Sequence, residues 1–197
     1  MKRILISFLL CLLMAGLVYA KEDAKMKDTF SVIHARKSVR IFTGASVSKA
    51  DLDKITRAGM AAPTAVNMQP WSFVVVTDRK KLDELAAGLP YAKMLFKAGA
   101  AIIVCTEPDK ANGKSKDLAV IDASLAGENI LLAIEALGLG GVWTAAYPYE
   151  DRMKHASAVL GIPQEVIPLN VIAVGVPAGQ DKSKDKYNKE KIHWEQW

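Results

Sequence analysis

Two short polar clusters have residue types that could bind the two halves of a mononucleotide. The first, Arg36-Lys37-Ser38-Val39-Arg40, holds three cationic side chains and one hydroxyl. Arginine offers a planar fork of donors and serine a short directional one, so this cluster suits a phosphate. The second places two amides, Asn67 and Gln69, between Pro63 and Pro70. Because an amide both donates and accepts, it can read the mixed edge of a heterocycle, and the pair of clusters predicts a mononucleotide cofactor.

Each cluster also has an ordinary structural interpretation. Cations at a helix end suit the helix dipole, so residues 36–40 could be a solvated basic face. Asn67 and Gln69 could simply form a turn, a role for which asparagine is well suited. The cofactor interpretation therefore depends on further motifs in the correct order.

Those further motifs resemble the flavin-dependent nitroreductase family. Its members typically carry Arg-Arg/Lys-Ser-x-Arg, then Ala-Pro-Ser-x-x-Asn-x-Gln-Pro-Trp, then a strand that ends near Gly-x-Pro. Here these motifs read Arg36 to Arg40, Ala62 to Trp71 and Val171 to Pro177. The segment from Lys186 to Trp194 is similar to the usual family ending, so the resemblance extends from residue 29 to residue 197.

The resemblance implies a homodimer that binds FMN at its subunit interface. The implied cofactor ligands are Arg36, Lys37, Ser38 and Arg40 at the phosphate and ribityl chain, and Pro63, Thr64, Asn67 and Gln69 in a loop that reaches the other subunit's flavin. The implied ligands also include Gly141, Trp143 and Thr144 beside the redox-active nitrogen of the flavin, and Lys184 and Lys186 near the C-terminus. Two positions depart from the family pattern. Thr64 replaces the usual serine but keeps a hydroxyl, and Lys186 replaces an arginine fork with a point charge.

The resemblance also implies that the flavin, through its N5 atom, carries the chemistry, so we predict no catalytic side chain. A nicotinamide, NADH or NADPH, would deliver hydride to N5, and an electron-poor nitroaromatic or quinone would then use the same face in a ping-pong cycle. A backbone N–H between Gly140 and Thr144 would hydrogen-bond N5, while Trp143 would either cover the ring or fill the core. The alternatives are a flavin-binding carrier without turnover and a related flavin reaction such as reductive dehalogenation.

The N-terminus has the pattern of a secretory signal peptide. Lys2 and Arg3 precede an apolar stretch from Ile4 to Val18, and Ala20 ends a plausible cleavage site. We expect cleavage there, a short extension over residues 21–28, and a periplasmic protein with no stable membrane association. The alternative is an uncleaved membrane anchor. Because reduced nicotinamides are cytoplasmic, export would call for a different electron donor.

Charge and composition exclude several classes of function. Removal of Lys2 and Arg3 lowers the formal charge from +5 to +3. The Lys-rich stretch Lys182 to Lys191 reads as a solvated tail that could supply one phosphate contact, rather than as a nucleic-acid site. Cys105 lies in an apolar run, which predicts a buried, unreactive thiol. The three histidines share no metal-ligand spacing, so we predict no metal.

The chain has no internal linker, so one domain is expected over residues 29–197. Predicted helices run from Thr29 to Arg36 (capped by Asp28 or Thr29), from a Ser48 cap to Ala62, from an Asp78 cap to Ala87, from Tyr91 to Ala98, from Asp117 to Leu137, and from Tyr149 or Glu150 to Leu160. Predicted strands are Trp71 to Thr77 and Ala100 to Thr106, both buried, followed by Val142 to Ala146 and Val166 to Val176. Residues 107–116 are expected to form an exposed loop near the site entrance. This order favours an α+β sandwich, and the resemblance implies three α/β/α layers around a mostly antiparallel sheet.

The helix predicted over residues 117–137 carries a row of small residues, namely Ala119, Ala123, Ala126, Gly127 and Ala133. Small side chains let another helix approach closely. The helix could therefore be the core helix of a monomer, and the resemblance implies that it packs at the centre of a homodimer; both roles can hold together.

Overall fold

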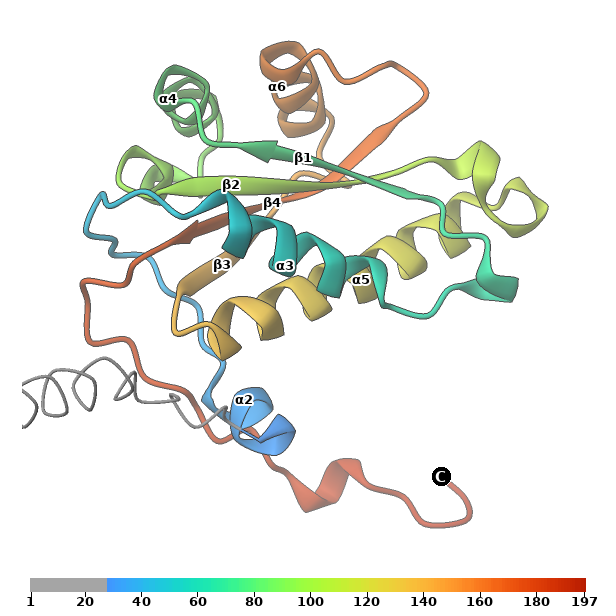
Figure 1. Ribbon diagram of the computed structural model, residues 1–197. Coiled ribbons are helices and arrows are strands. Elements are labelled where there is room, and N and C mark those ends of the chain that lie inside the picture. Colours follow the sequence, from blue (N-terminus) through green and yellow to red (C-terminus); the bar gives the residue numbers. More distant parts are fainter. Residues whose placement is uncertain (1–27) are drawn as a thin grey trace, which may run out of the picture.

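A four-stranded antiparallel sheet in the order β1-β2-β4-β3 lies at the centre of the described part of the chain (Figure 1). The strands are β1 (Trp71–Val76), β2 (Ala100–Thr106), β3 (Gly140–Ala145) and β4 (Ile167–Gly175). The computed structural model describes residues 28–197, so the predicted signal peptide lies outside the described residues. The expected α+β class and the antiparallel direction of the sheet are confirmed.

Helices cover both faces of this sheet, as the three-layer prediction requires. Helices α4 (Arg79–Gly88) and α6 (Glu150–Leu160) lie on one face, and α3 (Lys49–Met60) and α5 (Lys116–Ala136) on the other (Figure 1). Successive side chains of β2 alternate between the two apolar cores. Ile103 packs with the α4 and α6 side, and Ile102 packs with the α3 and α5 side.

The two central strands are buried, but β1 is not. All seven residues of β2 are buried, as predicted, whereas in β1 only Val76 is buried. The prediction of a buried first strand is wrong because β1 is an edge strand, and among residues 28–197 only β2 pairs with it. A run of apolar β-branched residues does not distinguish an edge strand from a central one.

Cys105 lies inside β2 with a free, buried thiol, in agreement with its prediction. Burial, with a smaller contribution from the charge of Glu107, raises the pKa of this thiol to about 12. The nucleophilic thiolate is therefore scarce near neutral pH.

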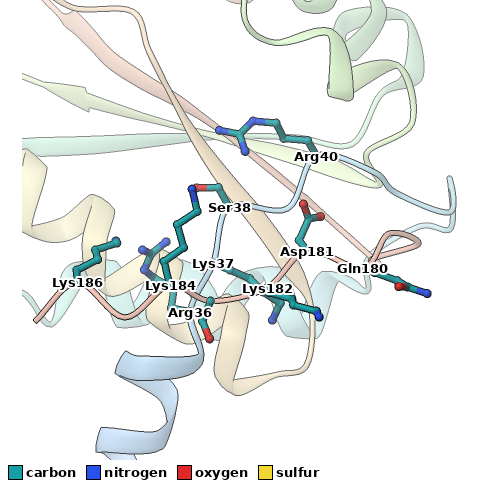
Figure 2. Close-up of a pocket in the computed structure, with 10 residues that line it drawn as sticks. Arg36, Lys37, Ser38, Arg40, Gln180, Asp181, Lys182, Lys184 and Lys186 are labelled. Carbon is teal, nitrogen blue, oxygen red and sulfur yellow. The ribbon is translucent and has the colours of Figure 1, made fainter.

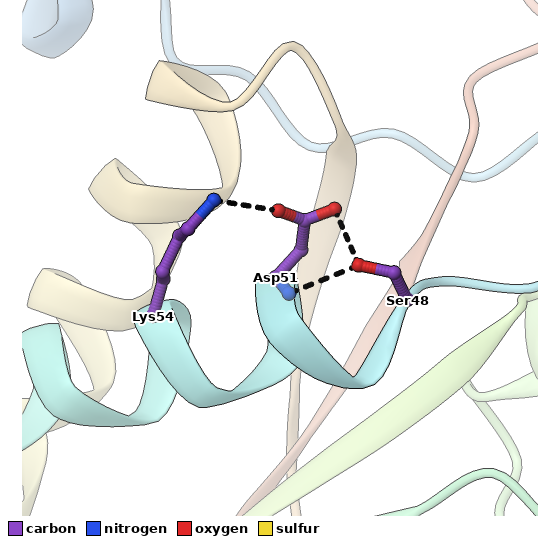
Figure 3. Close-up of polar contacts among 3 residues, drawn as sticks. All are labelled: Ser48, Asp51 and Lys54. Carbon is purple, nitrogen blue, oxygen red and sulfur yellow. Dashed lines mark hydrogen bonds and ion pairs between the residues drawn. The ribbon is translucent and has the colours of Figure 1, made fainter.

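Side-chain caps set the starts of the helices. Asp28, Ser48 and Asp78 each accept a hydrogen bond from the backbone N–H three residues later, at the starts of α2 (Thr29–Ala35), α3 and α4. The capping box predicted at Ser48 forms only in part. The carboxylate of Asp51 accepts from the Ser48 hydroxyl at 2.7 Å rather than from its backbone, and Lys54 lies 3.2 Å away (Figure 3). The pKa of the Asp51 carboxyl is lowered. The hydrogen bond from Ser48 is the largest cause, and the hydrogen bond from Lys54 is the next.

Two predicted segments differ from the structure. The helix expected from Tyr91 to Ala98 is a single 3-10 turn, η2 (Lys93–Phe96). The loop over residues 107–116 contains two such turns, η3 (Pro108–Lys110) and η4 (Asn112–Lys114), and Glu107 donates its N–H to the Pro70 carbonyl at 2.8 Å. Further 3-10 turns are η1 (Ala65–Asn67) and η5 (Lys189–Lys191). Within residues 28–197 no helix has the length and apolar character needed to cross a membrane.

Candidate functional site

The basic segment 36–40 leaves α2 and runs beside the start of β3. Ser38 forms a parallel bridge with Gly141, and Val39 donates its N–H to the Gly141 carbonyl at 2.9 Å. A Cβ atom added to Gly140 would lie 2.7 Å from Val39, so glycine at this position permits the close approach. The structure thus brings together the first and third segments of the predicted site.

The segment after β4 forms the opposite wall. Thr43 donates its N–H to Val176 at 3.0 Å, and Ala178 donates its N–H to Ile41 at 2.9 Å. These bonds carry the chain across the end of the sheet and place residues 180–186 opposite residues 36–40 (Figure 2).

Between these walls lies a cavity of about 640 Å³, here called the basic cleft. It is lined by Arg36, Lys37, Ser38, Arg40, Gln180, Asp181, Lys182, Ser183, Lys184 and Lys186 (Figure 2). Six of these side chains are cationic and only Asp181 is anionic, so the cleft favours an anion with several acceptor oxygens.

Two of the six cations already have partners on α5. Lys37 Nζ lies 3.2 Å from Glu135 Oε2, and that carboxylate is only 7% exposed. Arg36 Nε lies 3.5 Å from Glu128 Oε1, which is half exposed. We therefore expect Lys37 to balance the buried charge of Glu135, whereas Arg36 can exchange its solvated partner for a ligand.

Asp181 contributes an unusual acceptor to the cleft. Its Oδ2 atom is buried and has no hydrogen-bond partner in the described part of the chain. A buried acceptor without a donor is costly, so a ligand that carries a hydroxyl would satisfy it.

A second cavity, of about 570 Å³, adjoins the first and is here called the aromatic cavity. It is lined by Arg40, Pro90, Tyr91, Lys93, Met94, Val142, Trp143, Thr144, Ala145, Tyr149 and Arg152. Arg40 lines both cavities, so a ligand could extend from the basic cleft along β3 into the aromatic cavity.

The side chains of β3 are partly used by the fold. The Trp143 ring packs against α5, where a Cβ atom on Gly127 would lie 2.3 Å from Trp143 Cζ3. The Thr144 hydroxyl donates to the Val171 carbonyl at 2.7 Å. Of the two interpretations of the Trp143 ring, packing in the core is the one that the structure supports.

The amide loop, residues 63–69, lies apart from both cavities. Pro63, Thr64, Asn67 and Gln69 line neither of them. Asn67 and Gln69 have φ values of 61° and 52°, in the left-handed region. The loop is fixed in this strained form by Asp122 of α5, which accepts the Ala65 N–H at 3.1 Å. Within one chain, therefore, the amide loop does not meet the basic cleft.

Sequence reasoning missed part of both cavities. Gln180, Asp181, Lys182 and Ser183 belong to the basic cleft, although the Lys-rich stretch had the appearance of a solvated tail. Tyr91, Lys93, Tyr149 and Arg152 belong to the aromatic cavity and carry no family motif. Among residues 28–197, no group of three His, Cys, Asp or Glu side chains is placed to hold a metal ion.

Comparison with known proteins agrees with this geometry. Residues 33–176 match the model of the Nitroreductase family. A protein of Archaeoglobus fulgidus assigned as an NADH dehydrogenase/NAD(P)H nitroreductase is 39% identical over 175 residues, covering 87% of this chain and 100% of that protein.

Solved structures are similar over the same region. One from Bacteroides thetaiotaomicron with the same assignment has a TM-score of 0.81 and 47% identity, covering 87% of this chain and 99% of that chain. A nitroreductase from Desulfovibrio desulfuricans, in complex with FMN, has a TM-score of 0.74 and 27% identity, covering 87% and 98%. The chain therefore belongs to the nitroreductase family.

Proposed function

We propose that the protein is an FMN-dependent oxidoreductase that uses a reduced nicotinamide to reduce small electron-poor acceptors such as nitroaromatics or quinones. The observation that carries this proposal is the junction of the two cavities at Arg40. Arg40 lines both the basic cleft, which suits an anion, and the aromatic cavity beside β3, which would take a flat ring. The family relationship and the FMN complex of the Desulfovibrio relative support the choice of cofactor.

The residues present fit FMN. Arg36, Ser38, Lys184 and Lys186 would hold the phosphate, since they supply charged and hydroxyl donors within one cleft. The buried Oδ2 of Asp181 would accept from a ribityl hydroxyl, the kind of donor that it lacks. The backbone of β3 beside Gly141 would face the ring, because glycine leaves room for close approach.

When bound, FMN would supply two-electron redox chemistry that links a nicotinamide donor to an acceptor. The chain itself contributes binding, orientation and exclusion of water. Neither cavity is lined by a histidine or a cysteine that could serve as a proton donor or nucleophile. We propose that the cofactor, rather than a side chain, performs the reaction.

A homodimer would complete the site. We propose that the amide loop of one subunit reaches the basic cleft of the other, since the two are separated within one chain. In support, α2, α5 and the segment beyond β4 expose apolar side chains that a soluble monomer would be expected to cover. These are Phe30 and Ile33 on α2, Ile121 and Leu125 on α5, and Tyr187, Ile192, Trp194 and Trp197 beyond β4.

The decisive experiment combines cofactor content with turnover. The purified protein should be yellow, contain about one FMN per chain, and reduce 4-nitrobenzamide or a quinone with NADH or NADPH in steady state. Double-reciprocal plots at several donor concentrations should be parallel. A colourless protein that ignores added FMN would refute the proposal, and bound flavin without turnover would favour the carrier alternative.

The export of the protein is a separate proposal. We propose cleavage after Ala20 and release into the periplasm, on the basis of the N-terminal pattern alone. Mass spectrometry of the protein from fractionated cells should find a mature chain that begins at Lys21. A chain that retains residues 1–20 in the membrane fraction would instead establish the anchor.

A further inference from the structure

The aromatic cavity carries more positive charge than its position beside a flat ring requires. Arg40, Lys93 and Arg152 line it, and none of its lining residues is acidic. In residues 28–197 no carboxylate lies within ion-pair distance of Arg40, Lys93 or Arg152. An uncompensated group of cations in a partly enclosed cavity favours an anionic ligand.

Arg152 is the best placed of these cations because three neighbours fix its position. Its Cζ lies 3.7 Å from the ring centroid of Tyr149 and 5.3 Å from that of Tyr91. Its terminal Nη1 donates to the Ala145 carbonyl at 3.3 Å. A guanidinium that is already positioned loses little further conformational freedom when it binds a ligand.

At least one donor of Arg152 is buried and unused. Its Nε atom is buried and has no hydrogen-bond partner among the described residues. By contrast, Lys93 Nζ is occupied by the carbonyls of Ala86 and Ala87, at 2.7 and 3.0 Å, at the end of α4. Arg152 therefore has both the charge and the free donor that an acidic group needs.

We propose that Arg152 is a specificity-determining residue that binds an acidic group on the electron acceptor. This inference rests on the proposed function and adds a substrate class to it, namely single-ring aromatic acids. The Tyr91 and Tyr149 side chains would pack against the acceptor ring, while the Arg152 guanidinium pairs with its carboxylate.

The basic cleft does not need Arg152 for the cofactor. Arg36, Lys182, Lys184 and Lys186 already line that cleft, and Arg152 does not. Arg152 lies on α6 and lines the aromatic cavity, which adjoins the basic cleft at the shared residue Arg40. A second anion, distinct from a phosphate in the basic cleft, is therefore the simplest use of its charge.

The experiment compares two acceptors of nearly the same shape, 4-nitrobenzoate and the neutral 4-nitrobenzamide, with FMN-loaded full-chain protein. Wild type should have the lower KM for 4-nitrobenzoate. Arg152→Gln should raise that KM about ten- to a hundredfold and change the KM for 4-nitrobenzamide much less, since one charge-assisted contact is lost. Arg152→Lys should be intermediate. Lys154→Gln is the matched control, because it removes a charge from the same helix outside the cavity.

A binding measurement separates this inference from turnover. Isothermal titration calorimetry of the same variants with benzoate and benzamide should show a preference for benzoate that Arg152→Gln abolishes. Wild type that binds benzoate but reduces neither nitro compound would overturn the proposed function and leave the anion site standing.

Three results would overturn the role of Arg152. The first is an equal KM for 4-nitrobenzoate in wild type and a folded Arg152→Gln protein. The second is a loss of FMN affinity in that variant, which would assign Arg152 to the cofactor. The third is a raised KM for the nicotinamide alone, which would assign Arg152 to the donor.

Discussion

Gly127 on α5 lies against the ring of Trp143 on β3, and a Cβ atom at this glycine would come within 2.3 Å of Trp143 Cζ3. The contact joins the long helix to the strand that borders the aromatic cavity. Because the indole is a rigid ring held between the sheet and the helix, it has little freedom to move aside.

Replacement of this glycine tests the contact directly. Alanine would favour the helix by about 1 kcal/mol, but overpacking a core costs about 1–3 kcal/mol. With a contact this short, we expect Gly127→Ala to destabilise the protein by about 1 kcal/mol or more, measured by urea unfolding. In a Trp143→Leu background the same change should be neutral or stabilising. Stabilisation by Gly127→Ala in the wild-type background would contradict the packing described here.

Arg36 and its partner Glu128 should have opposite effects on cofactor affinity. Arg36→Ala removes a charged donor from the basic cleft and should weaken FMN binding about ten- to a hundredfold. Glu128→Gln removes the carboxylate that competes for Arg36, so binding should be equal or tighter. Fluorescence titration of FMN against each variant measures both effects. Equal affinity of wild type and Arg36→Ala would mean that residues 36–40 are a solvated basic face.

Lys37, in contrast, should matter more for stability than for the cofactor. Lys37→Met removes the ammonium that lies 3.2 Å from the buried carboxylate of Glu135. We expect a loss of about 1–2 kcal/mol in unfolding free energy, at the low end for a charged hydrogen bond because Lys37 remains partly solvated. The loss should shrink in a Glu135→Gln background. A large loss of FMN affinity with unchanged stability would reverse the two roles.

The proposed dimer predicts a charge-sensitive surface on α5. Leu125 is exposed in the single chain, so Leu125→Asp should leave a folded protein and yet prevent association. Light scattering should then report the monomer mass, and FMN should be lost because each site needs the partner's amide loop. Ala158→Asp, at an exposed position of α6 on the other side of the sheet, is the control. A Leu125→Asp monomer that retains FMN would refute the shared site.

The raised pKa of Cys105 predicts that stability declines at alkaline pH. Below pH 9 the thiol is neutral in both the folded and the unfolded chain. Above pH 9 the unfolded chain releases this proton while the folded chain, with a pKa of about 12, retains it. Stability should therefore fall by up to about 1.4 kcal/mol per pH unit between pH 9 and 12. Cys105→Val should show a smaller decline, and the native thiol should not react with a thiol reagent at pH 8.

Local signals in the sequence predicted the helices well. Asp28, Ser48 and Asp78 mark helix starts because each cap bonds a backbone N–H only three residues away. The buried faces also follow from local spacing, as with Leu52 and Ile55 of α3. Features that depend on such near neighbours could be read directly from the sequence.

Features that depend on contacts between residues far apart in the sequence could not be predicted from it. Whether an apolar strand lies at the edge or in the centre of a sheet depends on which strands pair with it. For this reason the burial of β1 was predicted wrongly. Asp181 lines the cleft only because β4 ends beside residues 41–43. Likewise, no sequence motif marks Arg152. Its proposed role depends on the packing of α6, which places Arg152 beside Tyr91.

A nascent chain makes the two walls of the basic cleft at different times. Residues 36–40 are synthesised early, whereas residues 180–186 follow only after all four strands. At roughly 5–20 residues per second, the first wall waits on the order of ten seconds for the second. A phosphate therefore has no complete binding site until residues 180–186 have been synthesised. Early folding of the sheet and of residues 36–40 is therefore not enough to bind the cofactor, because half of its charged donors arrive last.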